Sequence, residues 1–98
     1  MNIQAMMKQA QKLQKDMMNE KENIDKTVFI GKASFITIEV YGNKKVKSIK
    51  IDHDNLSDLD VEMLEDLILT AINDAMNQID KETEQKMGRF TNGLPGMF

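Results

Sequence analysis

Residues 35–51 read FITIEVYGNKKVKSIKI, and this stretch decides the fold. Its first part, residues 35–41, and its last part, residues 46–51, alternate apolar with polar side chains and are rich in β-branched residues, as strands are. Gly42 and Asn43 stand between the two parts and tolerate the positive φ of a tight antiparallel turn. The stretch therefore predicts a β-hairpin.

The sequence before the hairpin predicts one more strand and a long helix. Residues 27–30 are again β-branched and aromatic, and Gly31 marks the end of this short strand. Upstream of it, apolar residues recur at intervals of three and four, which predicts an amphipathic helix from Ile3 to about Asp25.

A second helix follows the hairpin. Capping side chains and acids after Ser57 predict that this helix begins near residues 58–61, and its apolar pattern ends at Gly88. The chain is thus an α+β protein of order α-β-β-β-α, with a three-stranded antiparallel sheet flanked by two long helices. Residues 1–88 form this domain, and residues 89–98, rich in glycine and containing the only proline, are predicted to be a flexible tail.

The first helix has two contrasting faces. At about 100° per residue, its apolar residues fall on one side and four of its lysines gather on the opposite side. The apolar stripe consists of Ile3, Met6, Ala10, Leu13, Met17 and Ile24. The lysines of the outer face are Lys8, Lys12, Lys15 and Lys26.

The lengths of these elements favour a dimer. The first helix would be about 35 Å long, whereas three strands spaced about 4.8 Å apart make a narrower sheet, so part of the apolar stripe stays wet in a monomer. The open edges of a three-stranded sheet can also be paired by a second copy, and two-fold symmetry is the commonest arrangement. The alternative is a monomer in which the two helices cover each other's stripes.

Charge is divided unevenly along the chain. The net charge is -3, but residues 1–51 carry +5 and residues 52–98 carry -8. Because phosphates respond to charge within a Debye length of about 8–10 Å, a basic half can bind DNA although the whole protein is acidic.

Composition excludes several classes of protein. Its 98 residues suit a single domain, and the absence of cysteine excludes disulfides and thiolate sites. There is no apolar run of about 20 residues to cross a membrane, and no secretory signal at the N-terminus. We therefore expect a cytoplasmic protein that does not bind membranes.

Four blocks, in order along the chain, resemble a known family. They are residues 6–14 in the first helix, 42–52 across the hairpin, 62–68 with 73–75 in the second helix, and 86–88 with 93–98 at the end. Together they resemble the YbaB/EbfC nucleoid-associated DNA-binding proteins over essentially the whole chain.

The resemblance implies a fold, an assembly and a function. Members of this family have an α-β-β-β-α chain that dimerises through the sheet region, so that paired helices project like tweezers around duplex DNA. They influence nucleoid organisation and gene expression, and they are neither enzymes nor dependent on a cofactor. The dimer interface is predicted to comprise Ile3, Met6, Ala10, Leu13, Met17, Phe35, Ile36, Ile38 and Val40.

Lys8, Lys12 and Lys15 are the first candidates for DNA contact, because exposed ammonium groups neutralise phosphates and release counterions. With one arginine and no helix-turn-helix pattern, contact with the DNA backbone and little sequence specificity are expected. The full predicted set is Lys8, Lys12, Lys15, Lys26, Lys44, Lys45, Lys47, Lys50 and Arg89. Simpler roles are also open: a solvated lysine face, strand-edge lysines that block aggregation, and an Arg89 that complements a helix dipole.

Two groups of acidic residues suggest other roles. Asp52, His53 and Asp54 form no metal or acid/base site, because a lone histidine without a second cluster is typical of an exposed turn. The acidic residues Glu62, Glu65, Asp66 and Asp74 indicate a solvated face on the second helix. The alternative function is a protein-binding adaptor in DNA replication or recombination repair, engaged through this helix or through the methionine-bearing tail.

Overall fold

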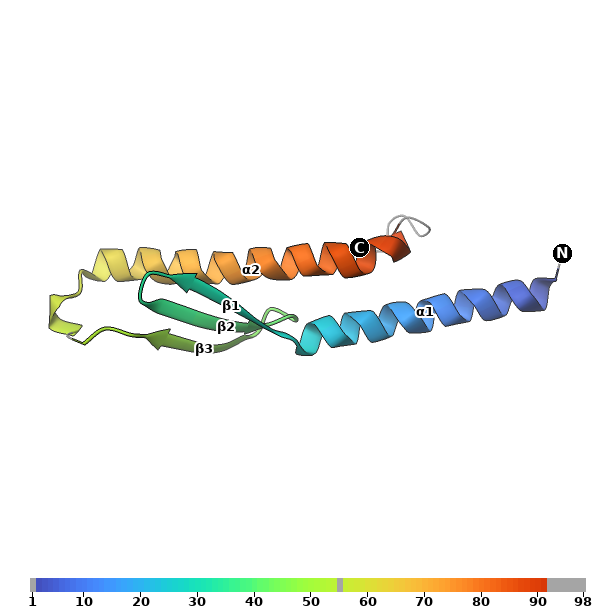
Figure 1. Cartoon of the computed structure of the whole chain (residues 1–98), viewed down its shortest axis with the longest axis horizontal. Coiled ribbons are helices and arrows are strands. Elements are labelled where there is room, and N and C mark those ends of the chain that lie inside the picture. The colour runs from blue at the N-terminus through green and yellow to red at the C-terminus, as the bar shows by residue number, and fades with distance from the viewer. Residues whose placement is uncertain (1, 55, 92–98) are drawn as a thin grey trace.

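The computed structural model describes residues 2–54 and 56–91 and has the predicted α-β-β-β-α order (Figure 1). Its elements are α1 (Ile3–Lys26), β1 (Val28–Ala33), β2 (Ile36–Tyr41), β3 (Val46–Ile51), a short 3-10 helix (Leu56–Asp58) and α2 (Val61–Thr91). All three strands are antiparallel, in the order β1-β2-β3. The α+β fold class is therefore confirmed.

Both helices begin at a polar side chain that caps them. Asn2 Oδ1 accepts hydrogen bonds from the backbone N–H groups of Gln4 (3.1 Å) and Ala5 (3.3 Å). Asp60 Oδ1 accepts one from the N–H of Glu62 at 3.0 Å, at the start of α2. Such caps satisfy N–H groups that have no partner within the helix.

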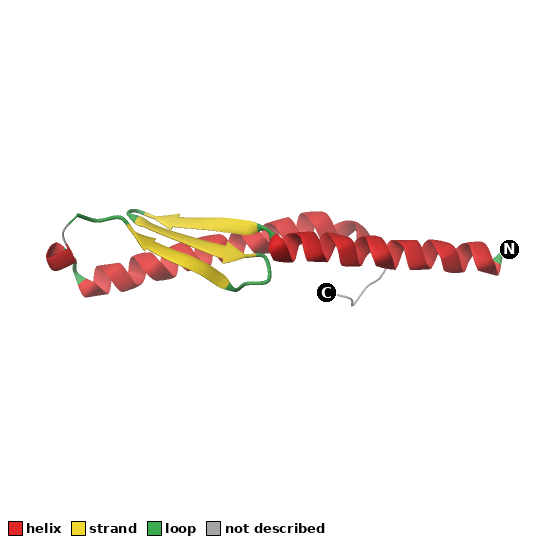
Figure 2. Ribbon diagram, turned by 90° about the horizontal axis from the view of Figure 1, so that it is seen from below, coloured by secondary structure: helices red, strands yellow, loops and turns green. Residues whose placement is uncertain are grey.

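The main core lies between α2 and one face of the sheet (Figure 2). Ile36, Ile38 and Val40 of the central strand have no exposed surface and pack beneath α2 of their own chain. These three residues were predicted to lie in the dimer interface, and within a single chain their side chains are already covered. Alternation shows that one face of a strand is buried, but it does not show which element buries it.

Strand β1 continues through Gly31 to Ala33, so the prediction that this strand ends at Gly31 was wrong. A Cβ at this position would lie 2.0 Å from the carbonyl oxygen of Ala71 and 2.8 Å from the nitrogen of Ala75. Glycine is thus needed where β1 and α2 touch through their backbones. The chain turns instead at Ser34, whose φ is 53°.

The β2–β3 turn forms where it was predicted, but its residues have different roles. The positive φ belongs to Lys44, at 73°, and not to Gly42 or Asn43. Gly42 is buried, and a Cβ there would lie 1.7 Å from the carbonyl oxygen of Ile24 at the end of α1. Gly42 is therefore required for close packing between the hairpin and α1.

Helix α2 extends past its predicted end at Gly88 to Thr91. Met87 and Phe90, which are 2% and 1% exposed, form a second buried cluster with Met17 and Ile24 of α1. Residues 89–91 are therefore part of the helix and not of the predicted flexible tail. The remainder of that predicted tail, residues 92–98, lies outside the described residues.

The molecule is long and thin, with extents of 72 × 20 × 14 Å. Helix α2 crosses the sheet and then runs beside the inner half of α1, while the outer half of α1 projects beyond both (Figures 1 and 2). The start of α1 and the start of α2 therefore lie at opposite ends of the molecule. The lysines in the first half of α1 therefore lie far from the acidic residues around the start of α2.

Candidate nucleic-acid interface

The projecting half of α1 is a basic arm, which we define as residues 3–15. Every residue of this arm is exposed. It carries Lys8, Lys12 and Lys15, and no acidic residue precedes Asp16. The spacing of four and three residues places the lysines on one face of the helix. Within the described residues, no ion pair involves these three side chains, so their charge is not neutralised locally.

Several other lysines predicted to bind DNA are paired with acids of the same chain. Lys26 Nζ lies 3.0 Å from Glu22 Oε1, Lys44 Nζ lies 3.3 Å from Asp80 Oδ1, and Lys47 Nζ lies 3.7 Å from Glu39 Oε2. These pairs are solvent-exposed and weak, but each places a carboxylate beside the ammonium group. The hairpin therefore offers a weaker positive field to a phosphate than the basic arm does.

Lys45 and Lys50 complete the predicted hairpin patch, and both are exposed. Among the described residues, neither makes an ion pair. Lys45 and Lys50 therefore stay in the predicted set of DNA-binding residues, after the three lysines of the basic arm.

Arg89 has a local partner. Its guanidinium carbon lies 4.4 Å from the centre of the Phe90 ring, a cation–π distance. As a residue of the last turn of α2 it also complements the helix dipole. The structure thus supports the simpler role that the sequence left open for this arginine.

The opposite end of the molecule is acidic. Residues 52–66 contain seven acids and neither lysine nor arginine. They form the segment around the 3-10 helix and the first turns of α2, far from the N-terminus in Figure 1. Repulsion from phosphates would keep this end away from a nucleic acid bound at the basic arm.

Two residues that sequence analysis did not single out for this role close one edge of the sheet. Asp74 Oδ2 accepts a hydrogen bond from the backbone N–H of Lys32 at 3.1 Å, and Gln78 Nε2 donates one to the carbonyl of Ile30 at 2.7 Å. Both backbone groups belong to the outer edge of β1. Asp74 therefore closes a strand edge, in addition to lying on the predicted acidic face. The only sequence signal for this role was the spacing of four residues between Asp74 and Gln78.

Within the part of the chain that the structure describes, α2 does not close the other edge of the sheet in this way. Helix α2 packs on β1 and β2 but not on β3. Ile49 and Ile51 pair with Ile38 and Ile36 across the hairpin and so share their face, yet they remain 50% and 38% exposed. With Val46, 47% exposed, they form an uncovered apolar strip on β3.

His53 packs edge-on against the Phe35 ring, with centroids 5.0 Å apart. No cluster of metal-ligating side chains occurs within residues 2–54 and 56–91. No helix in the same ranges is long and apolar enough to cross a membrane.

The family model of the YbaB/EbfC DNA-binding family matches residues 1–94. This chain belongs to the YbaB/EbfC DNA-binding family. The resemblance in the four sequence blocks is therefore confirmed, and it covers the basic arm, the sheet and all the described part of α2.

Bacterial relatives match over nearly their full length. A nucleoid-associated protein of Lactococcus lactis subsp. cremoris (strain MG1363) is 50% identical over 97 residues, which cover 97% of this chain and 98% of the relative. One from Ligilactobacillus salivarius is 42% identical, with 99% and 95% covered, and one from Enterococcus faecalis is 42% identical, with 97% and 93% covered. The similarity to these relatives thus extends over nearly the whole of both sequences.

Proposed function

We propose that this protein binds duplex DNA through the phosphate backbone, with little sequence selectivity, and that the basic arm makes the principal contacts. One observation carries the proposal: residues 3–15 are all exposed, bear Lys8, Lys12 and Lys15 on one face, and contain no acid. Since relatives bear the name nucleoid-associated, we expect the protein at the nucleoid in the bacterial cytoplasm, where it would influence DNA organisation and expression.

The side chains of the basic arm suit phosphates better than base edges. A lysine ammonium is a mobile point charge, whereas paired readout of guanine is typical of the planar arginine fork. The guanidinium group of Arg89, the only arginine of the sequence, lies over the Phe90 ring. Binding should therefore depend on counterion release and weaken steeply with salt.

Replacing Lys8, Lys12 and Lys15 together by glutamate should lower affinity for any duplex by at least about tenfold at low salt, because three phosphate contacts become repulsive. The slope of log affinity against log salt should also fall by about one for each lost contact. Fluorescence anisotropy with two labelled duplexes of unrelated sequence, at several salt concentrations, measures both quantities.

The matched control changes Lys21, Lys81 and Lys86 to glutamate, which alters net charge equally at positions outside the predicted DNA-binding set. This variant should bind much more tightly than the basic-arm variant. Equal losses would show that only total charge matters. Unchanged binding in the basic-arm variant would remove the arm from the interface.

We also propose that the protein is a homodimer in which the β3 edge of one copy meets that of the other. Asp74 and Gln78 already occupy the β1 edge, so β3 is the edge left for a partner. Its apolar strip, Val46, Ile49 and Ile51, would be covered there. The exposed arm residues Ile3, Met6, Ala10 and Leu13 stay predicted interface residues, whereas Met17 is buried against α2 of its own chain.

Ile49→Glu should weaken the dimer by at least about tenfold, because a two-fold interface carries the buried charge twice. Ile30→Glu is the matched control, since Ile30 is 46% exposed, lies on the other outer strand and makes the same chemical change. Sedimentation velocity across a concentration series gives both dissociation constants. If both variants weakened the dimer equally, or if neither weakened it, the β3 interface would be contradicted.

The acidic end supports a second candidate, the protein-binding adaptor. Val61 and Leu69 are 67% and 58% exposed beside the acids of residues 52–66, a combination that suits a basic partner with apolar anchors. Pull-down from nuclease-treated lysate should then recover a partner that Leu69→Ser no longer retains. Recovery that disappears with nuclease treatment would instead assign the association to DNA.

A further inference from the structure

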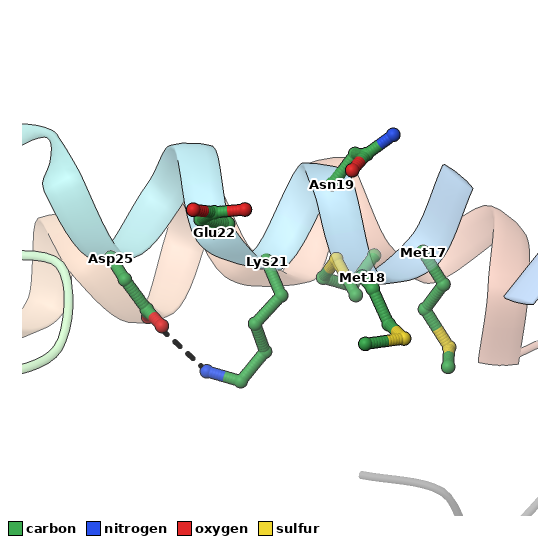
Figure 3. Close-up of a pocket in the computed structure, with 7 residues that line it drawn as sticks. Met17, Met18, Asn19, Lys21, Glu22 and Asp25 are labelled. Carbon is green, nitrogen blue, oxygen red and sulfur yellow. Dashed lines mark hydrogen bonds and ion pairs between the residues drawn. The ribbon is translucent and has the colours of Figure 1, made fainter. Parts of the chain in front are cut away.

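An apolar hollow lies where the end of α2 meets the middle of α1. It has a volume of about 490 Å³, and its apolar walls are Met17, Met18 and Met87. Lys21 and Asp25, whose side chains pair at 3.2 Å, also line the hollow. Figure 3 shows Met17, Met18 and Lys21 directed to the same side of α1, while Asn19 points away from them.

Part of this hollow is uncovered in the described structure. Met18 is 64% exposed, although Met17 and Met87 beside it are 9% and 2% exposed. A large apolar side chain next to a buried cluster favours an occupant that removes it from water. Methionine also suits an aromatic or irregular partner, because its thioether is flexible and contacts ring edges favourably.

We propose that residues 92–98 of the same chain dock in this hollow, in place of the free tail that composition predicts. The segment reads NGLPGMF, so Leu94, Met97 and Phe98 supply three large apolar side chains. Its glycines and proline allow the chain to reverse direction after a helix. The assignment depends on the hollow and on the position of α2, and not on whether the protein binds DNA.

The position of α2 makes the segment the nearest available occupant. The described helix ends at Thr91, one turn or about 6 Å beyond Met87, which lines the hollow. Seven further residues span up to about 25 Å when extended. They therefore reach Met18 without any movement of α1 or α2.

Docking would act as a strap on α1. Besides its contacts with β2, α1 is held to α2 by one small cluster: Met17 and Ile24 against Met87 and Phe90. A segment seated between Met18 and Met87 adds a third layer to that contact. The strap would therefore fix the direction in which the projecting half of α1 leaves the rest of the fold.

The first test uses methionine-methyl NMR on the full-length protein and on a Leu94→Ser, Phe98→Ser variant. The methyl resonances of Met18 and Met87 should move, because the ring and the leucine that contact them are removed. Met63, near the start of α2, is the internal control and should stay in place. Unchanged Met18 and Met87 resonances would overturn the proposal.

The second test exploits the absence of cysteine from the chain. Met18→Cys with Met97→Cys should oxidise to an intramolecular disulfide several-fold faster than Met63→Cys with Met97→Cys, since the bond needs Cα atoms within about 7 Å. Equal rates would overturn docking. Covalent dimers formed on mixing the single variants Met18→Cys and Met97→Cys would overturn docking within the same chain and assign the segment to a second copy.

Discussion

Replacing Gly31 by alanine is expected to destabilise the protein by about 3 kcal/mol or more, or to prevent folding altogether. The added Cβ would meet the Ala71 carbonyl oxygen at 2.0 Å and the Ala75 nitrogen at 2.8 Å. Both are backbone atoms of α2, so no side-chain rotation can relieve the contact. The sheet and α2 would have to separate, which opens the main core. Urea denaturation followed by circular dichroism measures the loss.

Gly88→Ala is the matched control for this prediction. Among the described residues, a Cβ at Gly88 meets no heavy atom within 4 Å beyond the adjoining backbone of its own helix, and the residue lies inside α2. Alanine there should raise the free energy of unfolding by about 0.5–1 kcal/mol, because glycine costs about that much in a helix. Similar effects at both positions would show that close approach between β1 and α2 is not what requires Gly31.

The two glycines also show where prediction from sequence stopped. Gly31 suggested the end of a strand and Gly88 the end of a helix, because glycine breaks such elements when only local preference acts. Contacts distant in sequence decided both cases: α2 lies against Gly31, and Phe90 is buried against α1 beyond Gly88. Periodicity, which depends on many residues, located all three strands and both helices.

The candidate site was predictable to a similar degree. Helical spacing alone placed Lys8, Lys12 and Lys15 on a common face, because the period of a helix is fixed. Helical spacing could not show that Lys44 and Lys47 have acidic neighbours. Asp80, which pairs with Lys44, lies on α2, and Glu39, which pairs with Lys47, lies on the neighbouring strand β2. Charge along the chain is therefore readable from sequence, but the field at a surface requires the tertiary pairing.

The hydrogen bonds that close the outer edge of β1 could not be predicted from the sequence for the same reason. Asp74 and Gln78 look like ordinary polar residues of an amphipathic helix, and their role appears only when α2 lies beside the strand. Sequence analysis could say that a three-stranded sheet has two edges open to a second copy. The structure reduces them to one, which is why the proposed interface moves from the buried residues of β2 to the exposed strip on β3.

Phe90→Ala should selectively release α1. Phe90 is 1% exposed, and truncating a buried phenylalanine costs about 3–5 kcal/mol. Its cluster, with Met17, Ile24 and Met87, is separate from the core between α2 and the sheet. The loss should therefore fall mainly on the opening of α1, and amide exchange there should accelerate about a hundredfold or more, since about 1.4 kcal/mol corresponds to a factor of ten.

Phe29→Ala is the comparison that makes this result specific. Phe29 is 8% exposed and belongs to the core between α2 and the sheet, so its truncation should accelerate exchange in β1, β2 and α2 together. Hydrogen–deuterium exchange with mass spectrometry resolves the two patterns. If Phe90→Ala instead weakened α1, the sheet and α2 equally, the two clusters would be one cooperative unit. The basic arm would then owe its position to the whole fold and not to a single contact at the end of α2.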